Sequence, residues 1–172
     1  MKIQLNIFRM ILAIVGFGLA VVYLTILVSS RDPLWFLGGF NELPDRIIVY
    51  SDGQKKEYNG QEENFTVLAY AVRASLNSGV YRPSGIGLSP DSLKEAYEKY
   101  ITVEVFFPKV VRLYTTYNKG EATQMLFLIT GRHSQVPTVL QGRDGIYLVN
   151  PPVLKTKQPL LDALKQLGYK ID

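Results

Sequence analysis

The sequence predicts an α+β protein in which an N-terminal transmembrane helix precedes one antiparallel sheet with helices on one face, a two-layer sandwich. Two observations support this fold class. An uncharged, apolar run extends from Met10 to Val28, and as a helix it would span roughly 28 Å, close to the thickness of the bilayer core. After residue 44, segments with a period of two alternate with segments of helical period, and short turns join neighbouring strands, which favours antiparallel pairing.

Residues 1–30 form the predicted cytoplasmic tail and membrane anchor. Lys2 and Arg9 precede the apolar run and Arg31 follows it, so the positive-inside rule places the N-terminus in the cytoplasm. A cleavable signal peptide is the alternative, although the run is longer than a typical signal core and ends in bulky residues. Residues 45–172 are then expected outside the cytoplasm, as an extracytoplasmic α+β domain on a single-pass protein of the cell membrane.

The composition narrows the class of protein further. The chain has no cysteine, which excludes an anchor on a lipid-modified cysteine, and a domain of this size can bury enough core without disulfides. All acidic residues follow Ser30, whereas several basic ones flank the anchor, so the domain itself is close to neutral. Its longest basic run is Lys55-Lys56, and a nucleic-acid interface needs a larger basic patch. We therefore expect a bacterial envelope protein that binds no nucleic acid.

Residues 31–44 are predicted to form an aromatic juxtamembrane linker. The segment holds Trp35, Phe36 and Phe40, and an early proline is expected to end the anchor helix. One interpretation is an aromatic belt in the outer headgroup layer. The other is a segment that docks against another membrane subunit, and under that interpretation these three aromatic residues contact the partner.

The first half of the domain is predicted to form a hairpin followed by two helices. Strands are expected over 44–50 and 54–58, because the Ser-Asp-Gly sequence between them is a turn signal. Apolar residues at helical spacing predict a helix over 62–77. A loop over 80–88 follows, and the Ser-Pro pair at 89–90 marks the start of another helix, since a capping hydroxyl and a proline at the first helical position are typical of helix N-termini.

The second half of the domain is predicted to contain five strands and a last helix. Residues 101–107 alternate in polarity, and Pro108 is expected to end that strand. Short turn sequences separate the strands that follow. The predicted strands are 101–107, 110–117, 123–129, 136–140 and 146–149, and the last helix is 159–167, closed by Gly168.

Two side chains have catalytic potential. His133 is the single histidine of the chain, so a transition-metal site is not expected, and no serine stands in a nucleophile-elbow sequence. We expect His133 to lie in a polar loop. Glu104 falls within a predicted strand, where we expect a cross-strand pair with Arg112, a ligand-binding role being the alternative. No catalytic residue, metal or cofactor is predicted.

Tyrosine is abundant, with 11 residues in the chain. Tyrosine is enriched at protein interfaces because it combines a rigid apolar ring with a polar tip. Tyr81 in the loop between the two helices, and Tyr114 and Tyr117 on a predicted strand, are therefore candidate partner contacts. Strands also favour tyrosine, so a structural role is the alternative.

These features favour a non-enzymatic, membrane-anchored accessory or assembly subunit whose extracytoplasmic domain binds another membrane or envelope protein. Residues 10–28 would contact lipid, and the spacing of Gly16 and Ala20 would let another helix approach closely. The first alternative is a membrane-anchored sensor or binding module for a small ligand, with a cleft near 79–88 and 130–135. The last alternative is an envelope hydrolase that uses the histidine or the mid-strand glutamate.

Overall fold

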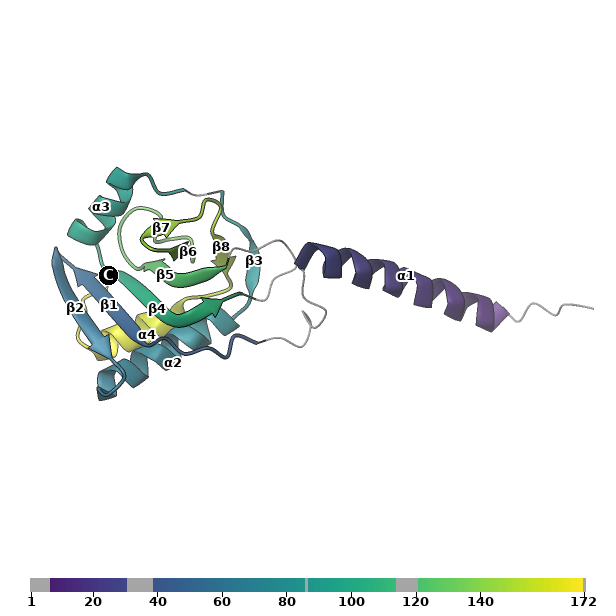
Figure 1. The fold of residues 1–172 in the computed structure, drawn as a ribbon, viewed down its shortest axis with the longest axis horizontal. Helices are drawn as coiled ribbons and strands as arrows, with labels where there is room; N and C mark the ends of the chain where they lie inside the picture. The colour runs from purple at the N-terminus through teal and green to yellow at the C-terminus, as the bar shows by residue number, and fades with distance from the viewer. Residues whose placement is uncertain (1–6, 31–38, 86, 114–120, 172) are drawn as a thin grey trace, which may run out of the picture. The chain divides into compact units, whose positions relative to one another are not determined.

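The computed structural model describes residues 7–30, 39–85, 87–113 and 121–171. The first helix is α1 (Ile7–Ser30), and the elements of the domain follow it (Figure 1). They are β1 (Arg46–Ser51), β2 (Gln54–Asn59), α2 (Glu63–Asn77), β3 (Val80–Pro83), α3 (Pro90–Lys99), β4 (Thr102–Val111), β5 (Ala122–Leu128), β6 (Val139–Arg143), β7 (Ile146–Tyr147), β8 (Pro152–Leu154) and α4 (Gln158–Gln166).

α1 is one continuous apolar helix. Its residues Ile7–Ser29 are long and apolar enough to cross a membrane, and none of them is buried. The hydroxyl of Thr25 donates a hydrogen bond to the carbonyl of Val21 at 2.8 Å, so this polar group is satisfied within the helix, as an apolar environment requires. α1 is thus compatible with a membrane anchor or with a signal sequence.

The sheet of the domain confirms the predicted fold class. Six strands pair antiparallel in the order β2-β1-β4-β5-β6-β7, and β3 pairs with β8 in a second, small sheet. The β1–β2 turn has positive φ at Asp52 (51°) and Gly53 (75°), and the β6–β7 turn at Asp144 (52°) and Gly145 (81°). Positive φ at both central positions matches the twist of the flanking strands, so these two hairpins form tight two-residue turns.

The helices predicted in the domain begin within about one residue of their expected starts, and two of their ends have the expected chemistry. The hydroxyl of Ser89 accepts a hydrogen bond from the backbone N–H of Ser92 at 3.2 Å, with proline at the start of α3. Gly168 follows α4 with a φ of 88°, a conformation that glycine adopts without steric cost.

The main core lies between α2, α4 and one face of the sheet. Leu68 and Val72 of α2 and Leu160 and Leu164 of α4 are fully buried there. Alternate residues of the strands face this layer, since successive side chains of a strand point to opposite faces of the sheet. Val103 and Val105 of β4 and Met125 and Phe127 of β5 belong to this core.

α3 differs from the prediction that the helices cover one face, because it packs on the opposite face of the sheet. Ala96 of α3 forms a second apolar cluster with Leu126, Leu128 and Leu140, and Figure 1 shows α3 apart from α2 and α4. The physical reason is that β5 is apolar on both faces, and its second face needs its own cover. The helices therefore occupy both sides of the sheet.

Pro108 does not end its strand, contrary to the prediction. β4 runs through Pro108 to Val111. Its pairing with β1 ends at Phe106, and its register with β5 shifts between Phe106 and Val111. A proline lacks the backbone N–H of the ladder and is tolerated at such an irregularity. The start of the predicted strand 110–117 thus belongs to β4, and its last four residues lie outside the described part of the chain.

The small sheet replaces two predicted loops. Val80 pairs with Leu154, and Pro83 pairs with Pro152, although the first segment was expected to be a connector and the two prolines at 151–152 to end the sheet region. Prolines are tolerated on a strand where no partner needs their missing N–H. This pairing holds the end of α2 near the start of α4, and the backbone N–H of Lys155 donates to the carbonyl of Gly79 at 2.9 Å.

Candidate functional site

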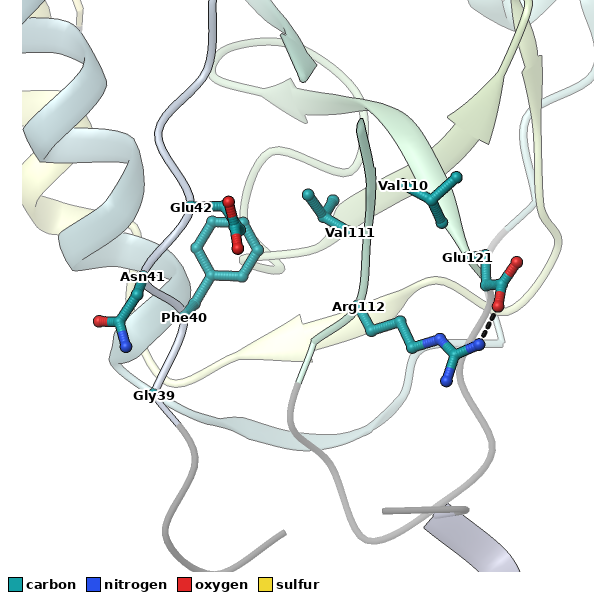
Figure 2. Close-up of a pocket in the computed structure, with 8 residues that line it drawn as sticks. All are labelled: Gly39, Phe40, Asn41, Glu42, Val110, Val111, Arg112 and Glu121. Atoms are coloured by element: carbon teal, nitrogen blue, oxygen red, sulfur yellow. Dashed lines mark hydrogen bonds and ion pairs between the residues drawn. The ribbon is translucent and has the colours of Figure 1, made fainter. Parts of the chain in front are cut away.

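A groove of about 470 Å³ lies where the N-terminal segment of the domain runs beside the end of β4. We call it the N-terminal groove; its lining residues are Gly39, Phe40, Asn41, Glu42, Val110, Val111, Arg112 and Glu121. Figure 2 shows the Phe40 ring and the Val111 side chain inside the groove, and Arg112 reaching toward Glu121. The groove exists because β1 stops pairing with β4 at Phe106, so the two chain segments diverge beyond that point.

One wall of the N-terminal groove is held by α2. The side-chain amide of Asn77 accepts a hydrogen bond from the backbone N–H of Phe40 at 2.6 Å and donates one to its carbonyl at 2.7 Å. The Phe40 ring is 3 % exposed and meets Phe107 edge-on, with ring centroids 5.6 Å apart. Phe40 is therefore part of the domain core, so its predicted contact with a partner is wrong, because its ring is covered by the domain itself. The folded domain begins several residues before Arg46.

The charged side chains of the groove form ion pairs. Glu42 pairs with Lys109 at 3.0 Å, and Arg112 pairs with Glu121. The hydrogen bond and charge of Arg112 lower the pKa of Glu121. With mixed charges at its rim and apolar side chains within, the groove suits contact with an amphipathic chain or a small polar molecule.

Glu104 lies at the centre of a buried polar group, which we call the tyrosine–glutamate cluster: Tyr50, Tyr97, Glu104, Gln124 and Tyr147. Glu104 is 6 % exposed. Its Oε1 accepts hydrogen bonds from Tyr147 at 2.5 Å, Tyr97 at 3.1 Å and Gln124 at 3.4 Å, and its Oε2 accepts one from Tyr50 at 3.0 Å. These side chains come from β1, α3, β4, β5 and β7, so the cluster ties α3 to four strands.

The expected pair of Glu104 with Arg112 is wrong. Arg112 follows directly on the strand that carries Glu104, since that strand continues through Pro108, and it pairs with Glu121 instead. Burial, together with the charge of Glu104, raises the pKa of Tyr50, Tyr97 and Tyr147 above the usual range. These hydroxyls therefore stay protonated and donate hydrogen bonds to the Glu104 side chain.

Lys157 is a second buried polar group that the sequence pattern did not reveal. It is 8 % exposed, and its ammonium donates to the carbonyls of Leu128 and Ser134, both at 2.6 Å. Burial lowers the pKa of Lys157 to about 8. The ammonium thus links the end of β5 and the following loop to the start of α4.

The other sequence-predicted contact residues lie apart from these sites. Gly16 and Ala20 are exposed on α1, and nothing lies within 4 Å of a Cβ built on Gly16. Tyr81 falls on β3. Trp35, Phe36, Tyr114 and Tyr117 lie outside the described residues, so their predicted roles stay predictions.

His133 lies in an exposed turn with a φ of 67°. The hollow beside it, lined by Leu88, Thr130 and neighbouring residues, holds about 10 Å³, which is about the room of one water molecule. The predicted ligand cleft near 79–88 and 130–135 is thus small in the described structure, and the N-terminal groove offers more room. Within the described part of the chain, no group of three or more His, Cys, Asp or Glu residues is arranged to hold a metal ion.

Comparisons of this chain with protein-family models, with curated proteins and with solved structures find no match. The function must therefore be inferred from the geometry of the molecule itself.

Proposed function

We propose that this protein is a non-enzymatic, single-pass membrane-anchored accessory or assembly subunit whose extracytoplasmic domain binds another membrane or envelope protein. The observation that carries the proposal is α1, an apolar helix of sufficient length to cross a bilayer, in which no side chain of Ile7–Ser29 is buried. Such a surface requires lipid or another apolar partner. Lys2 and Arg9 before the helix support a cytoplasmic N-terminus, and with that orientation the domain would lie outside the cytoplasm.

The domain supports a binding role rather than catalysis. Its most buried carboxylate, Glu104, is engaged by four donors, and its buried amine, Lys157, is engaged by two backbone carbonyls. Both side chains are almost completely shielded from solvent, at 6 % and 8 % exposed, so a substrate could reach them only by displacing the groups that cover them. We therefore expect the domain to act through its exposed surface, by contact with another protein.

Native electrophoresis tests the proposal. Membranes solubilised in mild detergent would be separated on a native gel, and chains that migrate with the protein identified by mass spectrometry. We expect migration within a larger complex. A Trp35→Ser/Phe36→Ser variant should lose the partner if the aromatic linker docks, whereas Ile146→Ser/Val149→Ser, which removes two exposed apolar side chains of the domain, is the matched control. Migration of the wild-type chain alone would contradict the proposal.

A small-ligand binding module is the second candidate, and the N-terminal groove favours it. A volume of about 470 Å³ falls within the range of small-molecule sites. Thermal shift of the full-length protein in detergent with a panel of envelope metabolites tests this function. A shift that Arg112→Gln abolishes would favour ligand binding, and the absence of any shift would argue against it.

A further inference from the structure

Two hollows flank the β1–β2 turn, at the end of β1 away from the N-terminal groove. Each has a volume of about 540 Å³. They share Ser51, Asp52, Gly168 and Tyr169 as lining residues, so the turn and the segment after α4 form the ridge between them. The two hollows therefore make one continuous, indented surface.

Four lysines line this surface, which we call the lysine surface: Lys55, Lys56, Lys99 and Lys170. Lys55 and Lys56 line one hollow, and Lys99 and Lys170 line the other. Asp52 is the one carboxylate among the described lining residues. Distant parts of the chain, β2, α3 and the C-terminal segment, thus bring positive charges together on a domain that is otherwise close to neutral.

Few of these charges are neutralised within the described residues. Lys99 pairs with Glu95 at 3.3 Å. The ammonium of Lys56 lies 5.0 Å from the centre of the Tyr58 ring, a contact that leaves its charge exposed to an anion. No carboxylate of the described residues lies within ion-pair distance of Lys55, Lys56 or Lys170. The positive potential of the surface therefore extends into solvent.

The ridge between the hollows is firmly held. The hydroxyls of Tyr169 and Tyr58 are 2.9 Å apart and share a hydrogen bond, and the backbone N–H of Tyr169 donates to the carbonyl of Leu164 at 3.0 Å. Tyr58 is fully buried. A surface built on such a fixed base requires little ordering when a partner binds.

The lysine surface is distant from the N-terminal groove. β1 leads from the N-terminal segment of the domain to the β1–β2 turn, and its six residues extend about 20 Å. The lysine surface and the N-terminal groove therefore lie at opposite ends of β1 and are separate surfaces of the domain.

We infer that the lysine surface binds an acidic segment of the partner protein. This inference rests on the proposed function and gives the chemistry of the partner. Spaced carboxylates fit better than one compact phosphate, because the lysines are divided between two hollows with Asp52 on the ridge between them. Complementary charge of this kind speeds association and selects the partner.

Binding of labelled deca-glutamate to the full-length protein in uncharged detergent tests the inference, with deca-glutamine as the uncharged probe. The variant Lys55→Glu/Lys56→Glu/Lys170→Glu should weaken binding about tenfold or more, because each exposed pair contributes a small increment. The matched control Lys94→Glu/Arg132→Glu/Arg143→Glu makes the same change in net charge outside the lysine surface and should bind as the wild type. Binding should vanish in about 1 M salt, where the screening length is near 3 Å.

Three outcomes would overturn the inference. The first is an equal loss of binding in both triple variants, which would show attraction to net charge alone. The second is lysine-dependent binding to phosphatidylglycerol vesicles without binding to deca-glutamate, which would make the ligand a lipid surface. The third is a partner that migrates equally with the wild type and the lysine variant on the native gel, and in that case the proposed function stands. The native gel separates the two proposals. If no other chain migrates with the wild-type protein but deca-glutamate still binds to it, the proposed function is wrong, whereas the preference of the lysine surface for acidic segments is retained.

Discussion

Replacing Tyr147 with phenylalanine removes one hydroxyl from the tyrosine–glutamate cluster and measures what the cluster contributes to stability. The hydroxyl donates to Glu104 at 2.5 Å and accepts from Gln124 at 3.0 Å. A hydrogen bond to a charged group contributes about 1.5–3 kcal/mol. Because Glu104 keeps its donors Tyr50 and Tyr97, we expect the free energy of unfolding to fall by about 2 kcal/mol. With an unfolding entropy of about 2.1 cal/mol/K per residue over roughly 130 residues, Tm falls by about 7 °C.

The assay is urea and thermal unfolding of the full-length protein in uncharged detergent, followed by near-ultraviolet circular dichroism. Tyr70→Phe is the control, because Tyr70 is 50 % exposed and its hydroxyl should contribute less than about 0.5 kcal/mol. The double variant Tyr97→Phe/Tyr147→Phe should deviate from additivity, since both hydroxyls donate to the same oxygen of Glu104. A Tyr147→Phe protein as stable as the control would refute the reasoning.

Further predictions concern the buried lysine, the tyrosine hydroxyls and the wall of the N-terminal groove. Burial lowers the pKa of Lys157 from 10.5 to about 8. Between these pH values the folded state binds fewer protons than the unfolded state, so the free energy of unfolding should rise from pH 8 to about pH 10. Urea unfolding of Lys157→Met should show no such rise, and a rise that persists in this variant would come from another group. The pKa values of Tyr50, Tyr97 and Tyr147 are raised in the folded state, so above about pH 10 the unfolded state loses these protons first and the free energy of unfolding should fall. In unfolding experiments, a variant with phenylalanine at all three positions should lose less stability above about pH 10 than the wild type. Asn77→Ala leaves the backbone groups of Phe40 without their side-chain partner and should lower the free energy of unfolding by about 1–3 kcal/mol. Hydrogen exchange at the Phe40 amide should accelerate in this variant, and an unchanged exchange rate would contradict the role of Asn77.

Local signals in the sequence predicted much of the fold. The helical stripe of α2, the Ser-Pro start of α3 and the turn sequences of both hairpins depend on neighbouring residues, so they can be read from a single chain. The extension of β4 through Pro108 could not be read in this way, because a proline is tolerated only where neighbouring strands no longer need its N–H. β3 and β8 pair over a long sequence separation, and four residues with a proline carry little strand signal of their own.

The polar groups were harder to predict because they are assembled from distant elements. The alternating polarity around Glu104 indicated a strand, but it did not indicate which element would cover the face of the sheet that carries Glu104. The apolar second half of β5 was the available sign that both faces of the sheet are buried, and it indicated that a helix such as α3 covers the face that carries Glu104. Lys157 carried no such sign, since a lysine beside a helix start is usually solvated.

The hydrogen bonding of β1 has a mechanical consequence. The N-terminal segment of the domain leads directly into β1, which pairs with β2 over six residues and with β4 over five. Because the hydrogen bonds of antiparallel strands run perpendicular to the strand axis, tension along β1 would load both ladders in shear, with many bonds sharing the force, instead of opening them one at a time. A force applied between the N-terminal segment of the domain and the β1–β2 turn would therefore be shared by both ladders.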